Sequence, residues 1–282
     1  MKLGKAVASA AAVGVMSTGL VGCSLSGKQA ADTAKAVKQE AADTADAMLA
    51  ALTKASDAAS QAGSAEVKMT VSMAETGGRP TVMTGVYSWG NGVAMEAELP
   101  AKDVQMEELV KDGTVTYRLV QGAYYYQVDR AESGPFEGKT WLKVDASAVL
   151  GDKGAAAMNG PNNDPTAGLK TLKWAKGVNK VGKEDVNGKP SVHYKATIPV
   201  EKLDKQTAGA AYEALGGAGT ELVTDVWVDE KGMPARLSQV FGSTAISMDF
   251  LSFGAAKEIA APPAAETADI TAAFKEANKA QG

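Results

Sequence analysis

The fold is decided at residues 66–73, where the sequence is EVKMTVSM. The apolar side chains of this stretch, Val67, Met69, Val71 and Met73, alternate with polar ones. Alternating residues lie on opposite faces of a β-strand. The stretch therefore predicts a strand with one apolar face and one polar face, which an antiparallel sheet can bury on one side only.

The segment before this strand has the period of a helix instead. Residues 31–61 are rich in alanine and contain neither Pro nor Gly, a composition that favours helix. Their larger apolar residues recur at intervals of four and three, which places them on one helix face. We expect the part around Met48, Leu49 and Leu52 to pack on the sheet, and Gly63 to end the helix.

The strand pattern recurs through the rest of the chain, interrupted by turn residues. Asn91-Gly92, Asp112-Gly113 and Asn187-Gly188 favour tight hairpins, because these residues tolerate positive φ. Further strands are predicted at residues 81–89, 93–99, 104–111, 114–121, 123–128, 140–144, 178–186, 191–198, 220–229, 235–241 and 245–253. A loop is predicted at residues 152–166, helices at 167–175 and 199–215, and an edge segment with a loose or helical terminus after residue 259.

These elements indicate an α+β protein with about ten antiparallel strands and about three helices. The apolar side of such a sheet needs a cover, and the helices are the available cover. They are few and rich in alanine. This mismatch is suggestive of a cavity against the sheet.

The N-terminus has the three parts of a secretory signal. Lys2 and Lys5 form a basic head, and residues 6–21 carry no charge. The sequence then continues as Leu20-Val21-Gly22-Cys23, which resembles the lipobox of bacterial lipoproteins. We predict cleavage after residue 22, lipidation of Cys23, and anchoring on the extracytoplasmic face of the cell membrane. The alternative is an ordinary signal peptide followed by an unmodified cysteine.

Composition narrows the function further. Cys23 is the only cysteine, so no intramolecular disulfide can form, and lipidation explains why it stands alone. The formal net charge is −4, and loss of Lys2 and Lys5 takes it to −6. The sequence has no basic stripe, so nucleic acid is not an expected partner. No cofactor motif is present, and one His with one Cys is too few for a zinc site.

Two hairpins resemble those of a known family. Residues 181–188 are VGKEDVNG, followed by His193-Tyr194, and residues 225–229 are DVWVD, followed by GMPAR at 232–236. With the tryptophan-containing strand at 141–144, their order and spacing behind the lipobox resemble actinobacterial LppX/LprG-type lipoproteins. The resemblance implies a LolA-like fold, a strongly curved antiparallel β half-barrel closed by a few α-helices around an apolar cavity.

The resemblance also implies a non-enzymatic protein that binds lipid or an acylated small molecule for envelope transport. The predicted domains are a signal peptide at residues 1–22, a lipidated tether at 23–45, the lipid-binding domain at 46–274 and a tail at 275–282. An envelope transporter or a regulatory protein is a possible partner. Two other functions stay open: a regulatory or sensory domain that recognises a partner protein, and a purely structural surface protein.

The candidate cavity lining consists of apolar residues on the predicted strands. Its methionines would adapt to an irregular ligand, although ordinary core packing is the alternative for each of them. Tyr124 and Tyr126 are expected to face away from Tyr125, so one side could meet the cavity. The candidate lining residues are Val67, Met69, Val71, Met73, Met83, Val93, Met95, Leu99, Tyr117, Leu119, Ile246, Met248 and Phe250.

Chemistry-bearing residues are scarce. His193, the only histidine, shares a predicted strand face with Ser191, Lys195 and Thr197, so we expect exposure or hydrogen bonding rather than catalysis. Acidic pairs such as Glu107-Glu108 lie near lysines and indicate a solvated surface. The sequence therefore favours binding over catalysis.

The lipobox generates a direct test. Cys23→Ser should leave the protein soluble or unprocessed, because serine offers no thiol for diacylglycerol transfer. We expect radioactive palmitate to label the wild type in cells and to leave the variant unlabelled. Equal labelling of the two proteins would contradict lipidation at Cys23.

Overall fold

In the computed structural model the chain divides into two units, Met1–Ala42 and Asp43–Gly282. The structure describes residues 27–73, 79–90, 92–158, 164–202, 219–254 and 258–281. The predicted signal peptide and Cys23 lie outside these residues. Of the first unit the described part is the beginning of helix α1 (Gly27–Ala62), which continues into the second unit.

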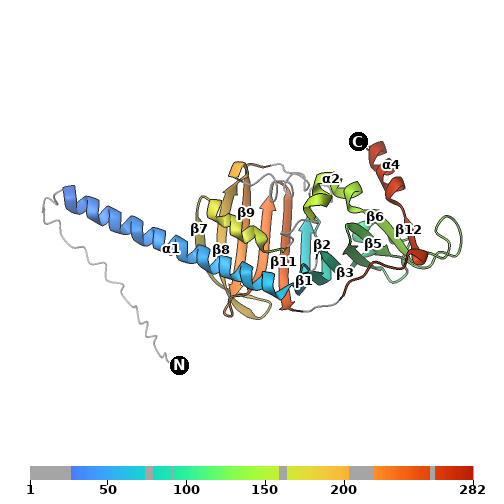
Figure 1. The fold of residues 1–282 in the computed structure, drawn as a ribbon, viewed down its shortest axis with the longest axis horizontal. Helices are drawn as coiled ribbons and strands as arrows, with labels where there is room; N and C mark the ends of the chain where they lie inside the picture. The colour runs from blue at the N-terminus through green and yellow to red at the C-terminus, as the bar shows by residue number, and fades with distance from the viewer. Residues whose placement is uncertain are drawn as a thin grey trace, which may run out of the picture. The chain divides into compact units, whose positions relative to one another are not determined.

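The second unit is built on one twelve-stranded sheet that is curved and unclosed. Its strands follow the order β12-β6-β5-β4-β3-β2-β1-β11-β10-β9-β8-β7, which Figure 1 shows from one edge to the other. Every pair is antiparallel except β12 and β6. The strands are β1 Ser64–Ser72, β2 Thr81–Ser88, β3 Ala94–Pro100, β4 Thr114–Val120, β5 Ala123–Gln127, β6 Trp141–Asp145, β7 Val178–Val186, β8 Lys189–Pro199, β9 Glu221–Asp229, β10 Pro234–Phe241, β11 Thr244–Phe253 and β12 Thr267–Asp269. The predicted fold class is confirmed.

One face of the sheet, called the inner face below, carries the main apolar core. Leu52 and Ala55 of α1 are fully buried there, and so is Val67 of β1. Leu169 and Leu172 of the 3-10 helix η3 (Ala167–Trp174) join the same core. The C-terminal half of α1 therefore packs on the sheet as its apolar spacing predicted. The helix ends before Gly63, whose φ is +67°.

The hairpin between β7 and β8 forms at the predicted residues. Asn187 and Gly188 have φ of 53° and 77°, the conformation that a two-residue turn with right-handed strand twist requires. The Gly188 amide donates a hydrogen bond of 2.7 Å to Asp185 Oδ1. Of the predicted Asn91-Gly92 turn, Asn91 lies outside the described residues.

The predicted strand at residues 104–111 is wrong. A 3-10 helix, η2 (Ala101–Val104), follows β3 directly, and Gln105 adopts a left-handed conformation. Strand β4 pairs directly with β3, so residues 104–111 have no free sheet edge to join. Val110 nevertheless packs with Ala101 in a second apolar cluster, which explains why the segment carries a strand-like apolar pattern.

The middle of the chain is more helical than predicted. Helix α2 (Ala146–Met158) occupies the first part of the predicted loop at 152–166 and breaks at Gly151, with φ 69° and ψ 170°. Alanines after the break restore helix propensity. The helix predicted at 167–175 is the 3-10 helix η3. Of the helix predicted at 199–215, the 3-10 helix η4 (Val200–Lys202) is described, and residues 203–218 lie outside the described part.

The C-terminal segment returns to the sheet. The 3-10 helix η5 (Ala264–Glu266) leads into β12, which pairs in parallel with β6, and helix α4 (Thr271–Gln281) follows. The predicted edge segment and helical terminus are both observed. Lys143 of β6 contacts Asp269 of β12 at 2.9 Å, and this ion pair ties the short edge strand to the sheet.

Strands β2 and β3 approach each other unusually closely at Gly85. Gly85 of β2 is the Cα partner of Ala97 on β3. A Cβ added at Gly85 would lie 2.5 Å from Ala97 Cα, and closer still to the Glu96 carbonyl oxygen. Because both obstacles are backbone atoms, the two strands could admit a side chain only by moving apart.

Gly85→Ala should therefore destabilise the protein by about 1–3 kcal/mol or more, the usual effect of overpacking. Gly182→Ala on β7 is the matched control, since a Cβ there meets no atom within 4 Å. Urea unfolding of both variants measures the difference. Equal midpoints for Gly85→Ala and wild type would contradict the close approach.

Candidate functional site

The structure brings the predicted lining residues to one face of the sheet. Five of them, Val67, Met95, Leu119, Met248 and Phe250, are buried members of the main core. Met69, Met83, Val93, Tyr117 and Ile246 are half-buried and pack against that core. Val71 and Met73 are half-buried as well. Leu99 is buried in the second cluster, with which Met83 and Tyr117 also pack.

Methionines from three strands form a row across the centre of the inner face. Met69 of β1 is the Cα partner of Met83 on β2 and of Met248 on β11. The row continues through Leu237 of β10 to Val226 of β9. Residue 248 is far from residues 69 and 83 in the sequence, so the pairing of β1 with β11 makes this apolar surface continuous. We call it the methionine row.

The described helices leave part of this face accessible. Met69 and Met83 of the methionine row remain half-buried although both belong to the face that the helices pack against. Val71 and Ile246, the next inward-facing pair along β1 and β11, are half-buried too. A stretch of accessible apolar side chains therefore lies beside the packed core. The sequence predicted these residues as a set, and the sheet places them side by side.

Tyrosines gather on the inner face at the other side of the sheet. The Tyr117 ring lies 5.9 Å from that of Tyr124 and 5.6 Å from that of Tyr126, measured between centroids. Burial raises the pKa of Tyr117, and it raises that of Tyr124 to about 12 with a smaller contribution from Tyr126. These phenols therefore stay protonated and can donate hydrogen bonds. Tyr87, which the sequence did not single out, lies on the same face with a pKa raised to about 12, chiefly by burial.

Tyr125 points the opposite way, as the strand alternation predicted. It is 7% exposed and packs with Trp141 on the outer face. Ala261 of the C-terminal segment packs against the same cluster, and the Arg118 guanidinium lies 4.8 Å from the Trp141 ring centroid. The outer aromatic pair is therefore covered by the chain itself.

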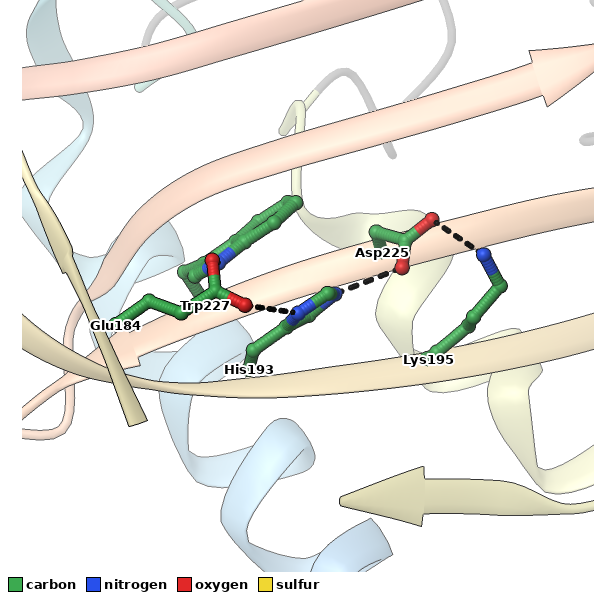
Figure 2. A network of polar contacts seen from close by, with 5 residues as sticks. All are labelled: Glu184, His193, Lys195, Asp225 and Trp227. Atoms are coloured by element: carbon green, nitrogen blue, oxygen red, sulfur yellow. Dashed lines mark hydrogen bonds and ion pairs between the residues drawn. The ribbon is translucent and has the colours of Figure 1, made fainter. Parts of the chain in front are cut away.

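A polar network on the outer face holds the only histidine (Figure 2). His193 Nδ1 lies 2.9 Å from Glu184 Oε1, and its Nε2 lies 2.7 Å from Asp225 Oδ1. The ring also stacks on Trp227, with 4.1 Å between centroids. A carboxylate accepts but does not donate, so both bonds form together when the imidazole carries both protons. The expected hydrogen bonding of His193 is confirmed.

The network continues across the neighbouring strands. Trp227 Nε1 donates to Glu184 Oε2 at 2.8 Å; this bond, and then the one to His193, lower the pKa of Glu184. Arg236 of β10 lies over the Trp227 ring and pairs with Asp249 of β11. Burial alone would raise the pKa of Asp249, but hydrogen bonds from Arg236 and Asn187 lower it.

This outer network is built for attachment rather than for reaction. Both ring nitrogens of His193 are occupied by carboxylates, and one ring face is covered by Trp227. Glu184 of β7 bonds to His193 of β8 and to Trp227 of β9. The network therefore fastens the edge strand β7 to the sheet. Within the described residues, no group of three His, Cys, Asp or Glu side chains could hold a metal ion. No helix in the described part is long and apolar enough to span a membrane.

Comparisons with known proteins agree with the fold. No protein-family model matches the chain. An uncharacterized 31.2 kDa protein from the rplA-rplJ intergenic region of Streptomyces griseus is 28% identical over 254 residues, covering 83% of each chain. The crystal structure of Mycobacterium tuberculosis lipoprotein LppX matches with a TM-score of 0.52 and 15% identity, over 76% of this chain and 99% of LppX. LprF from Mycobacterium bovis matches with a TM-score of 0.47 and 11% identity, over 76% of this chain and 96% of LprF. The likeness to LppX shows the fold, and at that level the resemblance to LppX/LprG-type lipoproteins is confirmed.

The outer network predicts unequal effects at the two partners of Asp225. The Asp225 side chain is 14% exposed, so His193→Ala leaves a buried carboxylate with Lys195 at 3.5 Å as its remaining cation. We expect a loss of about 1–3 kcal/mol of unfolding free energy. The Lys195 side chain is 51% exposed, so Lys195→Ala should cost at most about 1 kcal/mol. Urea unfolding checks both values, and equal losses would refute a structural role for the His193 bridge.

Proposed function

We propose that this chain is a membrane-anchored, non-enzymatic lipoprotein that binds a lipid or another hydrophobic ligand against the inner face of its sheet. One observation carries the proposal: half-buried apolar side chains from β1, β2 and β11 lie next to one another on the face that the helices leave partly uncovered. Contiguous accessible apolar surface of this kind can mark a ligand-binding groove.

The energetics favour a long apolar ligand. Transfer of apolar surface from water is worth about 25 cal/mol per Å², or about 0.8 kcal/mol for each buried CH₂ group. An acyl chain that covers Met69, Met83 and Val71 would remove their exposed surface from water together with its own. Flexible thioether side chains can follow the shape of such a chain, which rigid β-branched residues cannot.

The proposed location follows from the N-terminal sequence. Cleavage after residue 22 would leave Cys23 as the lipidated first residue, the segment at 23–45 as a tether, and residues 46–274 as the binding domain with a tail at 275–282. LppX, whose fold the chain shares, is itself described as a lipoprotein. The likeness supports a lipoprotein at the extracytoplasmic face of the cell membrane. A role in the transport of envelope lipids or lipoproteins is what the sequence resemblance implies.

Mass spectrometry of organic extracts distinguishes a ligand carrier from a regulator. Residues 24–282 are purified without detergent and extracted alongside a mock preparation. Lipid enriched in the protein sample supports a carrier. A clean extract together with a co-purified envelope protein would favour the regulatory function instead.

Two tryptophan substitutions on β1 test where the ligand lies. Val71 is half-buried, whereas Val67 on the same face is fully buried. The ring of Val71→Trp should occupy ligand space, so the variant should lose binding of a fluorescent fatty-acid probe and keep a nearly unchanged melting temperature. Val67→Trp overpacks a filled core and should lower the melting temperature, by about 2 °C or more for a loss of about 1–3 kcal/mol. A collapsed melt for Val71→Trp would mean that this part of the face is solid core.

A further inference from the structure

The apolar inner face is interrupted by one polar pair on β9 and β10. Thr224 and Gln239 are Cα partners on these neighbouring strands. Both alternate in phase with core residues, Thr224 between Leu222 and Val226, and Gln239 between Leu237 and Phe241. Their side chains therefore lie on the same face as the core. The alternation visible in the sequence is enough to locate them, although neither residue type suggests a site by itself.

The Thr224 hydroxyl is buried without a partner. Thr224 is 2% exposed, and its Oγ1 has no hydrogen-bond partner among the described residues. Leu222 and Val226 along β9 and Ala196 on β8 offer no side-chain polar atom, and the hydroxyl makes no hydrogen bond to Gln239, its partner on β10. A buried hydroxyl without a hydrogen bond is unfavourable, so such a group in a native fold calls for a partner that the chain does not supply.

Gln239 presents a neutral amide beside this hydroxyl. Its side chain is half-buried. The amide nitrogen lies beneath η3, 3.8 Å from the position that a Cβ on Gly168 would take. Because Gly168 has no side chain, no methyl group lies at that position beside the amide.

The pair is continuous with the proposed binding surface. Gln239 is also the Cα partner of Ile246 on β11, which in turn pairs with Val71 of β1. This row is displaced from the methionine row by two residues along each strand, about 7 Å. A ligand that follows the methionine row as far as Leu237 and Val226 would thus pass within reach of the polar pair.

We propose that Thr224 and Gln239 form a polar subsite that hydrogen-bonds the ester group of an acyl ligand whose chain lies along the methionine row. The subsite rests on the proposed function. The hydroxyl donates and accepts, and the amide donates through nitrogen, so together they match a carbonyl oxygen. Neither side chain is charged, and burial of an ionised carboxylate would call for a cation. The subsite therefore selects an uncharged ester over a free fatty acid.

The experiment compares ligands that differ only in the polar group. Methyl palmitate, palmitate and hexadecane, delivered from cyclodextrin, compete with a pyrene-labelled alkane for the purified chain of residues 24–282. We expect wild type to bind methyl palmitate at least about fivefold more tightly than hexadecane, the effect of one net hydrogen bond. Thr224→Val and Gln239→Met should each weaken the binding of methyl palmitate about fivefold and leave the binding of hexadecane unchanged.

Controls separate the subsite from a structural role. Thr224→Val should melt at the wild-type temperature or above it, because it removes an unpaired hydroxyl without changing shape. Thr224→Ser keeps the hydroxyl and should retain the preference for methyl palmitate. Thr197→Val, on the outer face of β8, is the matched control and should change the affinity for neither ligand.

Three results would overturn the subsite. Equal weakening of ester and hydrocarbon would mean that the pair shapes the face without bonding the ligand. Unchanged binding of both methyl palmitate and hexadecane would mean that the Thr224 hydroxyl bonds to water and not to the ligand. Tighter binding of palmitate than of methyl palmitate would contradict the preference for an uncharged group. Failure of wild type to bind any of the three compounds would instead count against the proposed function itself.

Discussion

A sheet of twelve strands with one apolar face must keep that face from water, and the other features of this structure depend on that constraint. Curvature meets part of it, since a curved sheet turns its apolar side chains toward one another. The absence of a side chain at Gly85 permits the close approach of β2 to Ala97 of β3 on this face. The end of α1 and the 3-10 helix η3 cover a further part, through Leu52 and Leu169. The remaining part is the half-buried apolar stretch that we assign to a ligand.

An unclosed sheet also has two edges, which other chains could pair with. Each edge is secured by polar groups on the outer face. At one end, His193 joins Glu184 of the edge strand β7 to Asp225 of β9. At the other, Lys143 lies between Asp145 and Asp269, and hydrogen bonds to both carboxylates raise its pKa. The histidine therefore has a structural task that accounts for its partners without any catalytic role.

The two faces of the sheet differ in the kind of polar group that they carry. Charged side chains pair with each other on the outer face, where water screens whatever remains unpaired. The inner face carries neutral polar groups instead: the tyrosines near β4 and β5, and the Thr224–Gln239 pair on β9 and β10. Neutral donors inside an apolar surface can orient a ligand without the desolvation cost of a charge. This arrangement suits selective binding of a largely apolar molecule.

Local sequence determined the elements of this protein, and tertiary pairing decided the site. The alternation at residues 66–73, the Asn187-Gly188 turn and the apolar face around Leu52 predicted their elements because each depends on neighbouring residues alone. The same local pattern misplaced a strand at 104–111, where β4 already occupied the partner edge. The meeting of Met69, Met83 and Met248 and the burial of the Thr224 hydroxyl depend on strand register between distant segments. No local period encodes that register, so only the folded sheet could show which side chains share a surface.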